Sequence, residues 1–287
     1  MAVPRYTVGA LSIAIVSDGT MWRDGGAVFG AVPKMLWSRV CPEINERNEV
    51  PLGLNCLLVE SEGKTVLIDT GYGNKNTALL EKRGVPVEHG RLLASLEAAG
   101  VSVEDVDVVI NSHLHSDHCG WNTRRAGEDL RPTFPRARYY VQRAEWEAAL
   151  HPNERTRAGY DAEHLLPLAE AGQVEFLEGE YQVTREIRVI EAHGHTADHA
   201  AVIISSGGET AVYLGDLVHH AVQLERLPWL CAYDDLPLMS METKRRIVAE
   251  AVAHNQLLIS AHNTFPGVGR LRSQEGKTQY LVEAGGA

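Results

Sequence analysis

The stretch His113-Leu-His-Ser-Asp-His-Cys-Gly120 constrains the fold of this chain more than any other. Three histidines and one aspartate fall within six positions, directly after the apolar run at residues 106–110. Imidazole nitrogen and carboxylate oxygen are good ligands for zinc and similar divalent ions. A loop that follows a strand can turn several such side chains inward together, because its backbone is free of the strand's two-residue alternation. The stretch therefore predicts a metal site at the end of a buried strand, and a solvated histidine-rich loop is the weaker interpretation.

Ligand-type residues follow other predicted strands in the same way. His195 comes after the strand at 187–190, Asp216 after the strand at 210–214, and His262 after the strand at 257–260. Asp69 ends a further strand, where a buried carboxylate suits the orientation of histidine ligands by hydrogen bonds. His193 and His199 flank His195, and we expect them to be packed and hydrogen-bonded rather than to bind metal.

The order of the remaining elements predicts an α/β fold. Helices are expected at 91–99, 144–150, 161–171 and 242–253, between apolar strands, which is typical of layered α/β proteins. Ser61-Glu62-Gly63-Lys64 predicts a hairpin turn. Residues 124–135 are charged and interrupted by proline, so we expect a loop there. The whole chain, 1–287, is interpreted as a single domain.

Residues 18–52 form a segment rich in glycine and proline that shows no clear periodicity. We expect a long irregular segment, because its large apolar residues, such as Trp22 and Trp37, are too many for a disordered linker. The functional alternatives are a cap over the substrate or a dimer contact, from which we expect a homodimer. The structural alternative is a segment that packs on the core.

The composition of the chain limits which binding partners and which cellular compartment we expect. The net charge of −11 disfavours nucleic acids and anionic membranes, which need a basic face. The four cysteines form no Cys-x-x-Cys pair and are expected to be reduced thiols, with Cys119 a small buried residue. The first residues lead straight into a strand pattern without a signal peptide, and no apolar run is long enough to span a bilayer. These features predict a cytoplasmic protein.

Taken together, the motifs resemble the metallo-β-lactamase superfamily. Its H-x-H-x-D-H run, Gly-His-Thr element, bridging aspartate and last histidine are all matched in order. The matching residues are His113, His115, Asp117, His118, His195, Asp216 and His262. The resemblance implies a four-layer αββα sandwich with two metal ions at one edge of the sheets.

The same resemblance implies how the ions are held. One ion would bind His113, His115 and His195, and the other would bind Asp117, His118 and His262. Asp216 and a hydroxide would bridge them, and Asp117 would also orient that hydroxide. Two neighbouring cations lower the pKa of a shared water towards neutrality. Zinc is the first choice of metal, and manganese, iron and cobalt also suit such a site.

The residues around the ligands resemble one branch of the superfamily, which includes N-acyl homoserine lactone lactonases and methyl parathion hydrolases. We therefore expect hydrolysis of a small apolar lactone or ester, with phosphotriester hydrolysis as the alternative. A di-iron redox protein and a ligand sensor with little turnover are the alternatives of another class. His219 stands where the lactonases commonly carry tyrosine, and we interpret it as catalytic, with a structural role as the alternative.

Overall fold

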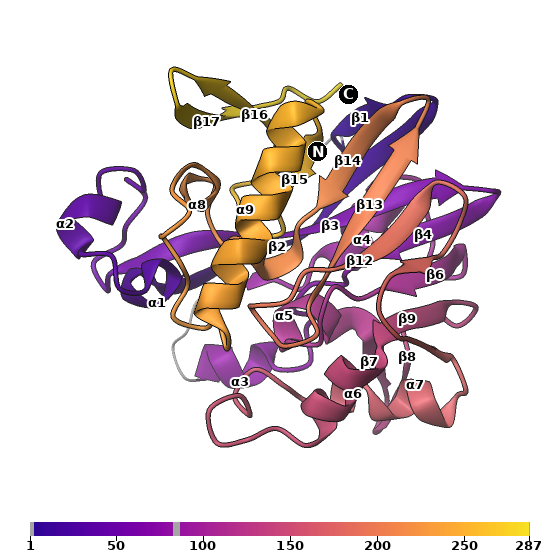
Figure 1. Ribbon diagram of the computed structural model, residues 1–287. Helices are drawn as coiled ribbons and strands as arrows, with labels where there is room; N and C mark the ends of the chain where they lie inside the picture. Colours follow the sequence, from indigo (N-terminus) through magenta and orange to yellow (C-terminus); the bar gives the residue numbers. More distant parts are fainter. Residues whose placement is uncertain (1–2, 83–86, 287) are drawn as a thin grey trace.

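Two β-sheets form the centre of the protein (Figure 1). The computed structural model describes residues 3–82 and 87–286. The strands of the first sheet are β1 (Arg5–Val8), β2 (Leu11–Asp24), β3 (Glu49–Ser61), β4 (Lys64–Ile68), β5 (Glu88–His89), β6 (Val106–Ile110), β9 (Arg138–Gln142) and β10 (Val174–Leu177). Those of the second are β11 (Tyr181–Gln182), β12 (Ile187–Glu191), β13 (Ala200–Ser206), β14 (Glu209–Tyr213), β15 (Leu257–Ile259), β16 (Val268–Gln274) and β17 (Lys277–Val282). The strand β7 (Thr123–Ala126) pairs with β8 (Asp129–Pro132) alone.

The helices are short, with one exception. They are α1 (Gly25–Phe29), α2 (Lys34–Trp37), α3 (Thr77–Lys82), α4 (Leu92–Ala98), α5 (Ser116–Cys119), α6 (Arg143–Leu150), α7 (Leu166–Glu170), α8 (Val222–Glu225) and α9 (Pro237–Ala253). None of the helices in the described residues is both long and apolar enough to cross a bilayer.

The strand order explains why one edge of the two sheets can carry a site. The first sheet runs β1-β2-β3-β4-β6-β9-β10 with β5 paired to β2, and the second runs from β11 to β17 in chain order. β4, β6 and β9 are parallel neighbours, and so are β14 and β15. The carboxyl ends of parallel strands meet at the same edge, where α/β proteins place their sites.

Apolar side chains from both sheets fill the space between them. Ile15, Leu57 and Ile110 of the first sheet belong to the same buried cluster as Val202 and Ile259 of the second. These residues come from strands that read as apolar runs, because such strands are covered on both faces. The hairpin between β3 and β4 turns at Glu62 and Gly63, both with positive φ, which confirms the turn predicted there.

Helices cover the outer face of each sheet. Leu92 and Leu96 of α4 lie in the cluster on the first sheet, and Ile247 and Val248 of α9 lie in the cluster on the second. Figure 1 shows α9 crossing in front of the strands of the second sheet. The four layers are therefore helix, sheet, sheet and helix, as the sequence predicted.

Three sequence predictions need correction. Residues 124–135 hold the hairpin β7–β8, whose pairing depends on a turn at Gly127 with φ 68° rather than on apolar alternation. The helix predicted at 242–253 begins earlier, at Pro237, because proline is well tolerated in the first turn. The helix predicted at 161–171 is two pieces, a single 3-10 turn at 162–164 and α7.

The segment 18–52 is more regular than expected. β2 continues through Asp24 and pairs with β3 from Glu49 onwards, with a register shift between Ser17 and Thr20. Glycine, proline and this irregularity hide the two-residue alternation in the sequence. Residues 25–48, which contain α1 and α2, extend from the end of this hairpin, and we call them the α1–α2 arm. The arm is held by its own apolar cluster, which includes Phe29, Trp37 and Val50.

Candidate metal centre

The predicted ligand residues come together at one edge of the two sheets. The first group follows β6, where the chain enters α5, and His195 follows β12. Asp216 lies in a 3-10 turn just after β14, and His262 lies just after β15. The structure thus brings together residues that are up to 149 positions apart in the sequence, because the strands that precede them end at a common edge.

Two groups of donor atoms form within this edge, and Asp216 is close to both. In the first group, the donor atoms of His113, His115, His195 and Asp216 lie within 4.8 Å of one another. In the second group, those of Asp117, His118 and His262 do the same. Asp216 also lies within this distance of His219 and His262. The sequence predicted this same division of the residues.

Hydrogen bonds outside the cluster determine which nitrogen of each histidine faces inward. The Nδ1 of His118 donates to Asp69 Oδ2 over 2.7 Å, and the Nδ1 of His195 donates to Asp234 Oδ1 over 3.0 Å. The Nδ1 of His262 donates to the carbonyl of Gly53 over 2.8 Å. Each partner can only accept, so each Nδ1 carries a hydrogen and each Nε2 faces the cluster. Such outer contacts orient the metal-binding histidines of many proteins.

The nitrogens that face the cluster lie close enough together to bind the same cation. His118 Nε2 and His262 Nε2 are 3.2 Å apart, and both face the cluster. Asp216 Oδ1 lies 2.8 Å from His118 Nε2 and 2.9 Å from His262 Nε2, yet this buried oxygen accepts no hydrogen bond among the described residues. Nitrogen and oxygen acceptors this close together need a proton or a cation between them. The donor set of imidazole and carboxylate therefore fits divalent metal ions.

The electrostatics of the cluster agree with this fit. Burial and the neighbouring His118 hold the pKa of His113 well below its ordinary value, and burial together with His195 lowers the pKa of His115 to about 3. Both rings are therefore neutral at neutral pH, which is the form that binds metal. Burial opposes protonation of His118 too, but the Asp216 and Asp69 carboxylates raise its pKa well above the ordinary value. A bound cation would take the place of that proton.

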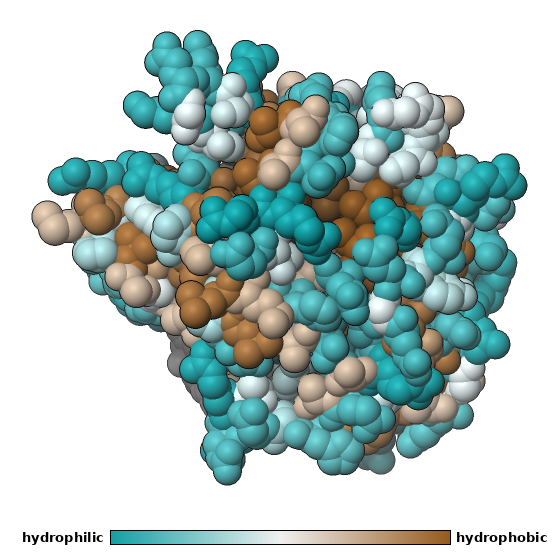
Figure 2. Space-filling view, viewed as in Figure 1, coloured by the Kyte–Doolittle hydropathy of each residue, from teal (hydrophilic) through white to brown (hydrophobic). Residues whose placement is uncertain are grey.

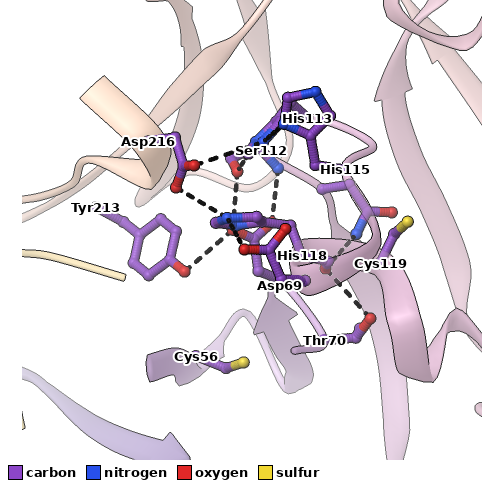
Figure 3. A network of polar contacts seen from close by, with 12 residues as sticks. Cys56, Asp69, Thr70, Ser112, His113, His115, His118, Cys119, Tyr213 and Asp216 are labelled. Carbon is purple, nitrogen blue, oxygen red and sulfur yellow. Dashed lines mark hydrogen bonds and ion pairs between the residues drawn. The ribbon is translucent and has the colours of Figure 1, made fainter. Parts of the chain in front are cut away.

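Asp69 is the centre of the network that supports the cluster (Figure 3). Its Oδ2 accepts hydrogen bonds from His118, from the Ser112 hydroxyl over 2.8 Å and from the Tyr213 hydroxyl over 3.0 Å. Its Oδ1 accepts from the backbone N–H of Ser112 over 2.7 Å. The Ser112 hydroxyl in turn lies 3.1 Å from His113 Nδ1. One carboxylate therefore fixes two of the predicted ligands, as its place at the end of β4 suggested.

Other buried groups that support the cluster were not found from the sequence. Asp234 orients His195, and Glu145 accepts hydrogen bonds from the backbone of Leu114 over 3.0 Å and from Thr196 over 2.6 Å. Asp234 lies in an irregular stretch, and Glu145 begins an ordinary-looking helix. A buried acidic residue would indicate such a supporting role. The sequence does not show that these two positions are buried, because their burial depends on tertiary packing.

The two flanking histidines behave as expected. His199 is buried, its Nδ1 lies 2.9 Å from the carbonyl of Ala192, and its Nε2 accepts from the backbone N–H of Asp216 over 3.0 Å. His193 contacts the carbonyl of Ala197. Cys119 is also buried, and its thiol contacts the Leu114 carbonyl at 3.3 Å. Neither histidine nor the thiol belongs to a metal-binding group among the described residues.

A cavity of about 350 Å³ opens directly above the cluster. Its lining includes His115, Asp117, His195, Asp216 and His219. The other walls mix apolar and aromatic residues with polar and charged ones, namely Met21, Leu52, Ala158, Gly159, Ala232, Tyr72, Tyr233, Ser116, Thr156, Asp235, Arg23 and Arg155. Among the large aromatic residues, Tyr233 lines the cavity, whereas Trp37 and Trp121 are buried in apolar clusters.

His219 lies between the cluster and this cavity. Its Nε2 is 3.1 Å from Asp216 Oδ2, and its ring stacks at 5.4 Å on that of His262. Its backbone N–H donates to the side chain of Gln223 over 2.7 Å, which fixes the turn that carries it. The residue is thus within reach of both a bound metal ion and a molecule in the cavity.

Known proteins share both the sequence pattern and the fold. A sequence profile of the metallo-beta-lactamase superfamily matches residues 50–253. An N-acyl homoserine lactonase of a Bacillus species is 32% identical over 161 residues, which cover 53% of this chain and 58% of that relative's length. A probable metal-dependent hydrolase from Staphylococcus aureus superposes with a TM-score of 0.87 at 27% identity, over 97% of this chain and 99% of that one.

The lactonase AidC, described as a dizinc quorum-quenching enzyme, has the same fold. It superposes with a TM-score of 0.83 at 20% identity, over 99% of this chain and 98% of that one. The match to the superfamily covers most of the chain, including six of the seven predicted ligands, and His262 follows just beyond it. The chain belongs to the metallo-β-lactamase superfamily.

Proposed function

We propose that this protein is a dinuclear metal-dependent hydrolase that opens N-acyl homoserine lactones. The observation that carries the proposal is the cavity of about 350 Å³ with the histidine and aspartate cluster as its floor and Met21 and Leu52 among its walls. Cavities of this size bind small molecules, and apolar wall residues beside polar groups favour a small substrate that has both an apolar and a polar part. A lactone that carries an acyl chain has both properties.

The ligand assignment follows from the distances to Asp216. One ion is assigned to His113, His115 and His195, and the other to Asp117, His118 and His262. Asp216 Oδ2 lies 3.2 Å from His195 Nε2, and its Oδ1 lies 2.9 Å from His262 Nε2, so each oxygen faces one group. When bound, two such ions polarise the carbonyl to be attacked and lower the pKa of a water between them. We propose zinc, and manganese, iron and cobalt favour similar donors.

Two side chains are assigned roles beside the ligands. Burial raises the pKa of Asp117, but His118 and His262 lower it more, and the net shift is below the ordinary value. Asp117 is therefore ionised at neutral pH and can accept a hydrogen bond from the attacking water. His219, next to Asp216 on the cavity lining, is assigned a hydrogen bond to the substrate carbonyl or to the leaving oxygen.

The relatives favour a lactone as the substrate. The Bacillus relative is named an N-acyl homoserine lactonase, and AidC was solved with the product N-hexanoyl-L-homoserine. These names describe those proteins. The cavity and the histidine and aspartate cluster of this chain support the same reaction for this protein.

The test is the initial rate of proton release from an N-acyl homoserine lactone by zinc-loaded protein. His113→Ala removes one proposed ligand, and His254→Ala is the matched control, because His254 is exposed just after the end of α9 and forms an ion pair with Glu250. Proton release by the wild type and by His254→Ala, but not by His113→Ala, is the expected result. If metal-loaded wild type releases no protons, the lactonase proposal is wrong, and esters and phosphotriesters are tested next on the same site.

Residues 18–52 are proposed to act as both wall and dimer contact within a single domain. Met21 and Leu52 line the cavity, and the α1–α2 arm exposes Met35 by 67% and Leu36 by 43%. Figure 2 shows hydrophobic residues over this arm at the left of the view. Exposed apolar residues on a protruding arm favour contact with a second copy of the chain. Sedimentation of wild type as a dimer and of Leu36→Glu as a monomer is expected, and identical sedimentation of the two contradicts the contact.

A further inference from the structure

Arg23 stands out among the residues that line the cavity above the metal cluster. It lies near the end of β2, two positions after Met21, so the two-residue alternation of the strand turns both side chains to the same face. Leu52 pairs with Met21 across the β2–β3 ladder and lines the same cavity. The strand therefore presents one cation beside two apolar residues on a wall next to Asp117.

The guanidinium group of Arg23 has more N–H donors than it has hydrogen-bond acceptors in the protein. Its Nη1 donates to the backbone carbonyl of Trp22 over 3.3 Å, and its central carbon lies 5.7 Å from the ring centroid of Tyr72. Within residues 3–82 and 87–286, no carboxylate comes within 4.0 Å of it. An arginine carries five N–H donors, so most of those of Arg23 have no protein acceptor there.

Arg155, the other arginine on the lining, has a structural role. Its Nη2 donates to the backbone carbonyls of Ala232 over 2.9 Å and of Asp234 over 3.1 Å, and its Nε lies 3.4 Å from the Asp235 carboxylate. These contacts join the loop after α6 to the stretch that holds Asp234 against His195. Arg155 thus donates to several acceptors of the protein, whereas Arg23 is held by the ring and hydroxyl of Tyr72 and by the Trp22 carbonyl and keeps some of its N–H donors for a ligand.

A guanidinium with unused N–H donors beside Met21 and Leu52 fits a ligand that has an acceptor oxygen beside an apolar chain. In an N-acyl homoserine lactone, the amide carbonyl is separated from the lactone carbonyl by three bonds and precedes the acyl chain. A group that contacts the amide must therefore lie on the wall next to the reaction centre, where Asp117 and Arg23 both line the cavity. An aliphatic lactone offers no acceptor at this position.

We infer that Arg23, braced by Tyr72, forms a subsite that hydrogen-bonds the acyl-amide carbonyl of the substrate and selects amide-bearing lactones over alkyl lactones. This inference rests on the proposed lactonase function and adds a determinant of substrate specificity. A hydrogen bond to a charged group contributes enough binding energy for a loss of roughly 10- to 100-fold when it is removed. Because the bond forms before and during the reaction, its loss raises KM more than it lowers kcat.

The experiment compares two lactones that differ only in the amide. N-hexanoyl-homoserine lactone carries it, and α-heptyl-γ-butyrolactone carries an alkyl chain of the same length on the same ring carbon. Arg23→Met keeps the aliphatic length without the donors, and Arg23→Lys keeps the charge without the planar fork. Arg272→Met is the matched control, because Arg272 is an exposed arginine of β16, away from the cavity and from the α1–α2 arm.

The expected result is a fall in kcat/KM of roughly 10- to 100-fold for the amide lactone with Arg23→Met, mainly through KM, and a change below about threefold for the alkyl lactone. Arg23→Lys should fall between wild type and Arg23→Met, and Arg272→Met should equal wild type. An equal loss on both lactones, or a loss on neither, overturns the inference. Circular dichroism checks that each variant is folded.

Binding of the ring-opened products separates this inference from the proposed function, because binding needs no turnover. The probes are N-hexanoyl-homoserine and 2-heptyl-4-hydroxybutanoate, titrated calorimetrically into zinc-loaded protein. If wild type opens neither lactone, the proposed function is wrong, but a tenfold weaker affinity of Arg23→Met for the amide-bearing product alone still supports the subsite. Equal affinities of wild type and variant for that product, or no binding of it to wild type, overturn the subsite.

Discussion

Replacing Asp69 by asparagine is the sharpest test of how the cluster is held. Asp69 has a positive φ of 56°, and asparagine tolerates this backbone conformation well, so the change alters charge and hydrogen bonding with little backbone strain. Asparagine is nearly the same size as aspartate. Its side chain has only one acceptor oxygen, however, and Asp69 uses both of its oxygens.

The magnitude follows from the four donors around the carboxylate. If the amide oxygen replaces Oδ2, the amide nitrogen lies at the place of Oδ1, 2.7 Å from the backbone nitrogen of Ser112, and two donors face each other. Stranding one buried donor costs about 1–3 kcal/mol. The hydrogen bond from His118 then goes to a neutral amide oxygen instead of a charged carboxylate. This removes about half of the strength of that bond. We therefore expect a loss of unfolding free energy of about 2–4 kcal/mol for the metal-free protein.

The metal affinity should fall as well, because His118 loses the partner that fixes its orientation. Loss of such an outer contact lowers metal affinity by about 10- to 100-fold, or about 1.4–2.8 kcal/mol. Competition with a chromophoric chelator measures the affinity at 25 °C, and circular dichroism confirms that the variant is folded. Tyr213→Phe is the control, since it removes one donor to Asp69 without removing the carboxylate.

Asp69→Asn should lower metal affinity, whereas Tyr213→Phe should lower stability alone. Tyr213→Phe also frees the backbone carbonyl of Asn55, so we expect a loss of stability of about 1–2 kcal/mol but a metal affinity within about threefold of wild type. A wild-type affinity in Asp69→Asn would refute the reasoning. Equal loss of affinity in both variants would show that general destabilisation, rather than the orientation of His118, is responsible.

Further expected outcomes concern the metal, its outer contacts and pH. Asp234→Asn should lower the zinc content towards one ion per chain by mass spectrometry, because Asp234 orients His195, and Asp235→Asn should retain two. Zinc at a thousandfold excess over its dissociation constant should raise the unfolding free energy by about 4 kcal/mol, and a chelator should reverse this gain in thermal melts. Burial lowers the pKa of Lys244 from 10.5 to about 8, so the folded state binds its proton less tightly than the unfolded state does. The unfolding free energy of wild type should therefore rise by about 2 kcal/mol between pH 8 and 10 relative to Lys244→Met, and parallel pH profiles in urea titrations would contradict this assignment.

The sequence predicted those parts of the site that depend on position along a strand. His113, His195 and His262 each follow an apolar run, and the ends of such runs meet at one edge of an α/β sandwich. This rule needs only local periodicity. It also placed Asp69 beside the histidines, because a carboxylate that ends a buried strand needs a donor or a cation.

The rest could not be predicted, because it depends on contacts between segments that the sequence does not pair. Asp234 has no local pattern, and it matters only because the stretch before α9 crosses over His195. Arg23 reads as an ordinary charge in a glycine-rich segment until the long β2–β3 hairpin turns it towards the cavity. The hairpin itself was hidden by the irregularity between Ser17 and Thr20, which shifts the two-residue pattern.

The position of the cluster between the sheets links metal binding to the stability of the fold. His113 and His118 are attached to the first sheet through β6, whereas Asp216 and His262 are attached to the second through β14 and β15. An ion that binds donors from both sets therefore joins the two sheets at the edge where the loops leave them. Without the ion, the contact between His118 Nε2 and His262 Nε2 across the same seam, at 3.2 Å, depends on a proton instead. Metal removal should therefore loosen this edge first, and amide hydrogen exchange should increase in the loops after β6 and β15 while the strands between them stay protected.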